Sequence, residues 1–324
     1  MKIMVFDVGG TEIKYSVMDE QMHRTNSGAV PTPQDTQAQF LDAVYRLYAP
    51  HKDEVSGIAM ALPGFVDNRT GYVSNGGALL YNTATPVGQL LAEKCGCPVI
   101  LENDGKAAAM AELANGALKD CCNAAVFIIG TGVGGGIIAN GQLVRGVHFT
   151  AGEYSFVNTN AEAWDAPDQN MACQCSTSNL LKWYRARKAL PEDAPLDGRS
   201  FFAAANAGEP EALEVLRRFC HAVAVQIYNL TVLLDVEKVA IGGGISKQPL
   251  LLESLRVLKK GGVFVLHDNM KPQMYGDMNA FVEELRGMGF AEVQYVETAE
   301  KIFGSKQRAA MMMLGNSAMI VGRK

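Results

Sequence analysis

One local pattern occurs twice in this chain: a short apolar strand, a turn of glycine and threonine, and a second β-leaning strand. The first copy spans residues 2–18 and turns at 9–11, and the second spans residues 123–144 and turns at 130–132. Strand-like runs on both sides of a glycine turn are typical of β-hairpins. A chain that opens each half in this way is expected to contain two similar α/β halves.

Helical and strand-like patterns alternate between and after the two hairpins. Apolar residues at helical spacing predict helices over residues 36–51 and 86–96 and a long helical stretch over about 198–234. Strands are predicted within 54–67 and 98–104. This alternation favours an α/β fold over an all-α or all-β one.

Composition narrows the range of possible functions. The chain has 324 residues, of which 48% are hydrophobic and 19% charged, as expected for a globular protein of about two domains. The net charge of −5 gives no basic surface for nucleic acid, and no apolar run reaches the ~18–20 residues of a membrane span. Because Met1 leads directly into a strand, no signal peptide is expected, so the seven cysteines are expected to be reduced in a cytoplasm.

The two glycine turns have the composition of phosphate-binding loops. Backbone N–H groups can approach a phosphate closely only where no Cβ intervenes, and threonine adds a hydroxyl donor. A single turn of this kind is equally compatible with a tight hairpin that binds nothing, but its repetition in both halves favours a ligand. The predicted phosphate-binding residues are Gly9, Gly10, Thr11, Gly130, Thr131 and Gly132.

Two better-known phosphate motifs are excluded. Residues 130–135, GTGVGG, match the dinucleotide fingerprint, but that fingerprint requires a following helix and here a strand pattern follows. The chain also contains no G-x-x-x-x-G-K-[ST] loop. We therefore expect phosphate to be bound by two facing hairpins, in a cleft between two lobes.

Asp7 ends the first strand immediately before the first turn. A carboxylate beside phosphates is repulsive unless a cation lies between them, so Asp7 is expected to bind Mg²⁺ through water. Lys14, on the second strand, is equally compatible with a phosphate contact and with a solvated lysine.

A polar cluster follows the strand predicted at 98–104. Strand ends of α/β sheets face the cleft, so Asp104 could accept a proton from a substrate hydroxyl while Asn103 orients the substrate. The alternative is that Asn103 or Asp104 only caps the following helix. Lys106, on that helix, is expected to be solvated.

The ordered motifs DVGGTEIK, PGFVD, ENDGKAAAMAELANG, GTGVGGGIIANGQLVRGVHFTAGE and IGGGIS resemble those of the ROK family of sugar kinases, within the actin-like ATPase superfamily. The resemblance covers roughly residues 1–254. It implies a two-lobed actin-like ATPase (ribonuclease H-like) fold with a cleft between duplicated lobes. The expected boundaries are 1–118 for the N-terminal lobe, 119–254 for the C-terminal lobe and 255–324 for an atypical segment.

The resemblance also implies an activity: transfer of the ATP γ-phosphoryl group, with Mg²⁺, to the 6-hydroxyl of a hexose-type sugar. Asp104 would be the base, and Asn103 and Glu153 would hold sugar hydroxyls in a pocket that Gly64 helps to line. The nucleotide would contact both turns and the third glycine run. Its further residues would be Lys14, Gly134, Gly242, Gly243 and Gly244.

The chain departs from the family pattern after the second turn. Where many members have Gly-Glu-x-Gly-His, the histidine position is Phe156, and the C-x-C motif that starts at Cys173 lacks the third cysteine. The second sugar-binding glutamate is replaced by Lys182. We therefore expect no zinc. The sequence is similar to a zinc-less branch with β-glucoside and N-acetylmannosamine kinases, which leaves the sugar open.

Residues 255–324 form a further departure, because they resemble the closing strands and helix of class I methyltransferases. No methyltransferase cofactor loop precedes them, so a second complete enzyme is not expected. Two alternatives to a kinase also stay open: a sugar- or nucleotide-binding regulator without catalysis, and an inactive relative. The regulators in this family carry an N-terminal helix-turn-helix, which this sequence lacks. The resemblance also makes a homodimer possible.

Overall fold

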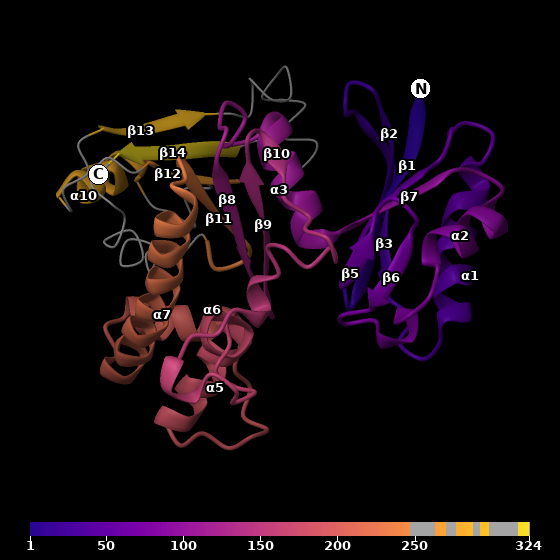
Figure 1. The fold of residues 1–324 in the computed structure, drawn as a ribbon. Coiled ribbons are helices and arrows are strands. Elements are labelled where there is room, and N and C mark those ends of the chain that lie inside the picture. Colours follow the sequence, from indigo (N-terminus) through magenta and orange to yellow (C-terminus); the bar gives the residue numbers. More distant parts are fainter. Residues whose placement is uncertain (247–262, 270–276, 288–291, 298–316, 324) are drawn as a thin grey trace. The chain divides into compact units, whose positions relative to one another are not determined.

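Figure 1 shows the computed structural model of the chain, which describes residues 1–246, 263–269, 277–287, 292–297 and 317–323. The chain divides into two compact units. Unit 1 is Met1–Ala107 with Arg145–Ala151, and unit 2 is Ala108–Val144 with Gly152–Lys324. The helix expected at residues 248–260 lies outside the described residues.

Unit 1 is built on a five-stranded sheet. In spatial order its strands are β3 (Arg24–Pro31), β2 (Glu12–Asp19), β1 (Lys2–Val8), β4 (Ile58–Leu62) and β7 (Val99–Asn103). The pairs β3–β2 and β2–β1 are antiparallel, whereas β1–β4 and β4–β7 are parallel. The expected hairpin is therefore present, and two parallel strands extend the sheet from it.

Alternating apolar residues explain why β1 lies in the centre of this sheet. Met4, Phe6 and Val8 are at most 1% exposed and share one face of the strand. Two helices, α1 (Gln37–Tyr48) and α2 (Val87–Cys95), contribute further side chains to this core. The shorter elements of unit 1 are η1 (Ala49–His51), β5 (Phe65–Asp67), β6 (Tyr72–Asn75) and η2 (Leu80–Asn82).

Unit 2 repeats the strand order of unit 1. Its sheet runs β10 (Gln142–Leu143), β9 (Val133–Ala139), β8 (Ala124–Ile129), β11 (Lys238–Gly242), β12 (Val263–Asn269), β14 (Ser317–Arg323) and β13 (Glu292–Glu297). The first three strands are antiparallel to one another, and β8–β11 and β11–β12 are parallel. This is the arrangement of β3-β2-β1-β4-β7, so the two halves have the same topology.

The helical stretch expected over about 198–234 is two helices. A turn at Gly208, whose φ is +82°, separates α6 (Gly198–Asn206) from α7 (Pro210–Leu234). Gly tolerates this left-handed conformation and Pro210 suits the first helical position, so both residues favour the break. The other helices of this unit are η3 (Tyr154–Phe156), η4 (Ala161–Ala163), α4 (Met171–Cys175) and α5 (Thr177–Arg187). Helix α3 (Asp104–Asn115) begins in unit 1 and continues into unit 2.

Helix α7 supplies much of the core of unit 2. Val215, Phe219, Val223 and Ile227 recur at helical spacing, and each is at most 5% exposed. They belong to the same apolar cluster as Phe127 of β8. One face of α7 is thereby buried along its length.

The described parts of residues 255–324 continue the sheet of unit 2. Strand β12 is parallel to β11, and β14 lies between β12 and β13, antiparallel to both. Helix α10 (Met278–Gly287) packs against β13, and its Val282 and Leu285 join the core. Over the part of the chain that the structure describes, no helix has the length and apolarity to cross a bilayer.

Phe219→Ala tests the core role of α7. Because the Phe219 ring is 0% exposed, its loss should lower the free energy of unfolding of unit 2 by about 3–5 kcal/mol. Urea unfolding followed by circular dichroism measures the change. The matched control is Val232→Ala on the same helix, where the side chain is 64% exposed and a change within about 0.5 kcal/mol is expected. Equal effects of the two substitutions would contradict the assignment.

Candidate active site

The first glycine turn presents free backbone donors. The Gly9 N–H donates to the Glu12 carbonyl at 2.9 Å, which closes the turn. The carbonyls of Gly9 and Gly10 accept from Thr32 Oγ1 at 2.8 Å and Gln34 Nε2 at 2.7 Å. Within the described residues, no hydrogen bond uses the N–H groups of Gly10 or Thr11. The turn therefore offers two adjacent donors, as a phosphate site requires.

Asp7 and Lys14 face each other across the first hairpin. They are paired residues in the β1–β2 register, and Lys14 Nζ lies 3.7 Å from Asp7 Oδ2. Both side chains are more than 60% exposed, so the ion pair itself contributes little to stability. An exposed carboxylate beside a phosphate-type turn remains accessible to a hydrated Mg²⁺ ion.

Asp104 is the first residue of α3, directly after β7. It reaches the surface of unit 1, yet the surrounding protein removes enough water from its carboxylate to raise its pKa above the ordinary 3.8. The hydrogen bond from the Gly105 N–H acts in the opposite direction. The negative charge of Asp7 raises the pKa further, so these two carboxylates lie within electrostatic reach of each other.

Asn103 caps α3, which was the alternative interpretation of this position. Its Oδ1 accepts the Lys106 N–H at 2.9 Å, and its Nδ2 donates to the Gly64 carbonyl at 2.9 Å. The residue is only 5% exposed. Capping and sugar binding are compatible, because one N–H of the amide has no partner among the described residues. The bond to Gly64 places the two predicted sugar-pocket residues beside each other.

Gly64 needs to be glycine at this position. Its φ is +102°, and a Cβ built there would lie 2.0 Å from the Asn75 carbonyl oxygen. Any side chain would displace this loop and with it the carbonyl that holds Asn103.

Glu102 and Arg145 form an ion pair that the sequence pattern did not predict. Glu102 Oε2 accepts from Arg145 Nε at 2.9 Å and lies 2.8 Å from a second nitrogen of the same guanidinium. Glu102 Oε1 accepts the Asn103 backbone N–H at 3.0 Å. The pair anchors the segment Arg145–Ala151 to unit 1 and supports the residue before Asp104.

The expectation that Lys106 is solvated is wrong. The residue is 1% exposed, and its positive charge lowers the pKa of Asp104 in opposition to burial. It lies in the first turn of α3, close to where β7 and the Gly64 loop cover the helix start. No periodicity in GKAAAMAELANG distinguishes a buried lysine from a solvated one.

The second glycine turn repeats the design of the first. The Gly130 N–H donates to the Gly132 carbonyl at 2.9 Å, and the Gly130 carbonyl accepts the Thr177 N–H at 2.8 Å. No hydrogen bond in the described part of the chain uses the N–H groups of Thr131 or Gly132. Further along β9, a Cβ on Gly135 would lie 1.9 Å from the Val126 carbonyl, so that position is also restricted to glycine.

The third glycine run lies beside this turn. Gly243 has a φ of +97°, and a Cβ there would meet the Ile129 carbonyl at 2.1 Å, immediately before Gly130. Around Gly244 the space is open, and Ser246 holds the Gly243 carbonyl through its N–H and its Oγ. Unit 2 thus brings residues 130–132 and 242–244 together. Gly134, which pairs with Ile128, belongs to the same hairpin.

Glu153 immediately precedes η3 and is partly buried. The next residue, Tyr154, fixes this segment: its ring stacks on Phe127 with centroids 4.3 Å apart, and its hydroxyl donates to the Gly136 carbonyl at 3.1 Å. Phe156, which replaces the histidine of the family pattern, is 65% exposed.

Two polar residues beside the second turn were also missed. Thr177 Oγ1 and Asn179 Nδ2 are buried and have no hydrogen-bond partner in the described part of the chain. Both lie in the first turn of α5, which Ser176 caps. Because unpaired buried polar groups are rare, these two are candidates for a role next to the Gly130 turn. The only signal in the sequence was their place in the altered cysteine motif.

Among the described residues, no group of three or more His, Cys, Asp or Glu side chains converges as a metal site. Cys173 and Cys175 lie on α4, and Cys175 is buried, which raises its pKa to about 12. A protonated thiol is a poor zinc ligand. The absence of zinc nevertheless stays a prediction.

The predicted residues form two groups, each within one unit. Unit 1 brings together the first turn with Asp7 and Lys14, and the cluster of Gly64, Asn103 and Asp104. Unit 2 brings together the second turn and the third glycine run, and it also carries Glu153. The cleft that would join the two groups stays a prediction.

Replacing Asp104 by Asn should stabilise the protein at neutral pH. The pKa of this carboxyl is raised on folding, so ionising it costs stability as the pH rises through the unfolded pKa, 3.8, towards the folded value. Below 3.8 the variant should therefore match the parent protein, and at pH 7 its free energy of unfolding should be higher. Denaturant unfolding at several pH values measures the difference. Asp193→Asn, at an exposed site, is the control and should show no such pH dependence; a less stable Asp104→Asn variant at pH 7 would refute the raised pKa.

Comparison with known proteins assigns the family. The model of the ROK family matches residues 3–271. A β-glucoside kinase from Listeria innocua is 31% identical over 79% of this chain and 87% of its own length, and an N-acetyl-D-glucosamine kinase from Vibrio atlanticus is 30% identical over 77% and 86%. A ROK family glucokinase from Streptomyces griseus, solved with glucose and AMPPNP, is 25% identical with a TM-score of 0.67 over 79% of this chain and 88% of that one.

These matches agree with the repeated strand order and the paired glycine turns. The chain belongs to the ROK family and has its actin-like ATPase fold.

Proposed function

We propose that this protein transfers the γ-phosphoryl group of ATP to O6 of a hexose-type sugar. The enzyme class, a carbohydrate kinase, follows from the family and from relatives that are named sugar kinases over most of the chain. The observation that supports the chemistry best is the arrangement of unit 1: a carboxylate of raised pKa, Asp104, within electrostatic reach of Asp7 at a turn with two free N–H donors.

Asp104 acts as the general base. A raised pKa makes its carboxylate a stronger proton acceptor while leaving it ionised near neutrality, which suits removal of a proton from a sugar hydroxyl. Its place at the start of α3 is fixed by the Asn103 cap and the Glu102–Arg145 pair. Asn103, with its one available N–H, and Glu153 hold sugar hydroxyls beside Gly64.

The nucleotide phosphates are bound by the N–H groups of both glycine turns, and Gly242–Gly244 admits the adenosine. Asp7 fits a bridging Mg²⁺ ion, because it is an exposed carboxylate next to the first turn; Lys14 balances its charge. ATP with Mg²⁺ supplies the electrophilic phosphoryl group. Phosphoryl transfer of this kind depends mainly on positioning and charge neutralisation.

The sugar is a hexose of the class used by the named relatives: a β-glucoside, an N-acetylhexosamine or glucose. Release of ADP should be measured with each of these sugars, and the product identified by mass spectrometry and ³¹P NMR. A 6-deoxy sugar separates O6 from the other hydroxyls, because it should not be phosphorylated. Binding of sugar and ATP without any ADP release would favour the alternative, a non-catalytic regulator.

Asp104→Asn should bind ATP as tightly as the parent protein and lose turnover by about 10²–10⁴-fold, since general-base catalysis contributes on that order. ADP release and nucleotide titration measure the two effects separately. Asp193→Asn serves again as the matched control and should retain full turnover. Unchanged turnover in Asp104→Asn would remove the base from this position.

Asp7→Asn should have two separable effects. The Mg²⁺ concentration needed for half-maximal turnover should rise, because a carboxylate that holds the hydrated ion is lost. The acid limb of the pH–rate profile should also move to lower pH, because the Asp7 charge no longer raises the pKa of Asp104. Activity falls as the pH drops through the Asp104 pKa, so a lower pKa extends activity into more acidic solution. A profile unchanged in both respects would contradict the assignment.

A further inference from the structure

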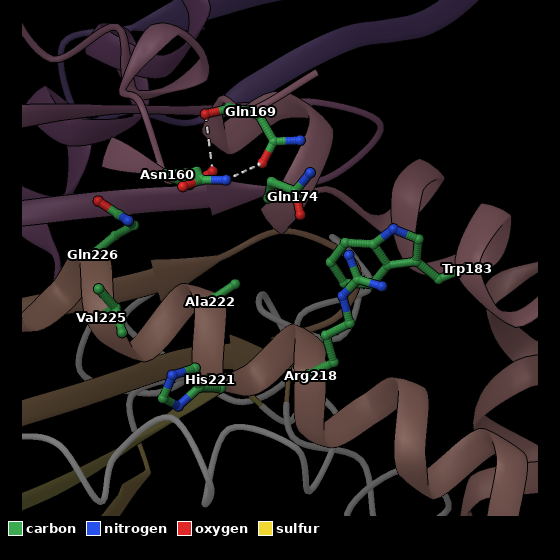
Figure 2. Close-up of a pocket in the computed structure, with 10 residues that line it drawn as sticks. Asn160, Gln169, Gln174, Trp183, Arg218, His221, Ala222, Val225 and Gln226 are labelled. Atoms are coloured by element: carbon green, nitrogen blue, oxygen red, sulfur yellow. Dashed lines mark hydrogen bonds between the residues drawn. The ribbon is translucent and has the colours of Figure 1, made fainter. Parts of the chain in front are cut away.

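A cavity of about 280 Å³ lies within unit 2, away from the glycine turns. Figure 2 shows its walls: helix α7 forms one side, residues 159–174 form the opposite side, and Trp183 of α5 closes one end. The volume lies just below the ~300–1,000 Å³ typical of ligand sites, so the cavity suits a molecule of about monosaccharide size.

Gln226 is an unpartnered polar group in this cavity. The residue is 6% exposed, and in the described part of the chain its amide makes no hydrogen bond. Figure 2 shows its side chain extending from α7 towards Asn160, on the opposite wall. A buried amide without partners is costly, and it is expected where a ligand supplies the missing hydrogen bonds.

Arg218 marks the other end of the cavity, two helical turns earlier on α7. Its guanidinium lies over the Trp183 ring, 3.7 Å from the centroid. Stacking uses the face of the guanidinium and leaves the N–H donors at its edge available. Among the described residues no carboxylate pairs with Arg218, and no acidic side chain lines the cavity. An anionic group is therefore favoured at this end.

The remaining polar groups are neutral amides. Gln174 projects into the space between Arg218 and Gln226, and its Nε2 is already held by the Asp168 carbonyl at 2.8 Å, which leaves its Oε1 as an acceptor. Arg218 and Gln226 are eight positions apart, which corresponds to about 12 Å along a helix. The cavity thus offers a cation at one end and neutral hydrogen-bonding groups at the other.

We propose that this cavity binds a phosphorylated monosaccharide, with its phosphate on Arg218 and its hydroxyls on the amides of Gln174 and Gln226. The anion site itself follows from the cavity alone, whereas the choice of a sugar phosphate over another small anion rests on the proposed function, whose product has this chemistry. Bound at a distance from the turns, the product class of a sugar kinase would occupy a second, non-catalytic site.

Trp183 gives a local signal for the test. The chain has two tryptophans, and Trp164→Phe removes the other, which is 74% exposed. Glucose 6-phosphate added to this full-length variant, without ATP, should change the Trp183 emission in a saturable way. Glucose, inorganic phosphate and glucuronate are the comparison ligands. Each lacks either the phosphate or the sugar, so each should bind at least about tenfold more weakly. Tighter binding of glucuronate would overturn the choice of phosphate.

Two substitutions assign the signal to this cavity. Gln226→Glu places a negative charge where the neutral amide stands, and Arg218→Gln removes the cation; each should weaken glucose 6-phosphate binding by about tenfold to a hundredfold in calorimetry. The matched controls are Arg217→Gln, which removes the neighbouring charge on α7, and Gln39→Glu on α1. Both should bind as the parent protein does. If Gln226→Glu fails to fold, Arg218→Gln, at an exposed residue, still decides the question.

The outcome is independent of turnover. Equal binding by Arg218→Gln and the parent protein would overturn the site even if the protein phosphorylates sugars. Conversely, cavity-dependent binding of glucose 6-phosphate in a protein that phosphorylates no sugar would refute the proposed function and leave the site standing.

Discussion

The candidate active site depends on how the carbonyl groups of two glycine turns are held. Thr32 and Gln34 bind the Gly9 and Gly10 carbonyls, and the Thr177 N–H binds the Gly130 carbonyl. Because these carbonyls are engaged, the peptide planes are fixed and the next N–H groups remain available in both turns. An anion requires such preorganised donors, since donors that must first reorient would lose much of their advantage. The supporting residues therefore matter as much as the glycines.

The same topology in both units explains why the phosphate-type turns recur. In each unit a hairpin is followed by a parallel strand, and the turn lies at the strand end where the backbone can be approached. The two units differ in the residues at the end of a later parallel strand: unit 1 has the Asn103–Asp104 cap and base after β7, and unit 2 has Gly242–Gly244 after β11. A duplicated scaffold thus carries acid–base groups in one half and a further glycine run in the other.

The sequence predicted the hairpins, the turns and the strand before Asp104, because strand alternation and glycine turns are local signals. It left open whether Asn103 caps α3 or contacts substrate, and its amide caps the helix with one donor remaining. Lys106 was placed in solvent, although it is buried. That burial, like the pairing of Glu102 with Arg145, depends on segments distant in the chain. Such tertiary contacts leave no periodic pattern from which they could be predicted.

The departures from the family pattern and the second cavity occupy the same stretch of unit 2. Phe156, Cys173 and Lys182 mark where the zinc and sugar-binding positions differ, and residues 159–174 and Trp183 from this stretch line the cavity opposite α7. A metal would tie this segment through its ligands. Here it is held instead by the Tyr154–Phe127 stack and by amide hydrogen bonds such as Asn160 to Gln169, 3.2 Å. A segment built of amides rather than thiolates leaves neutral donors and acceptors facing α7, which is the chemistry a polyhydroxylated ligand needs.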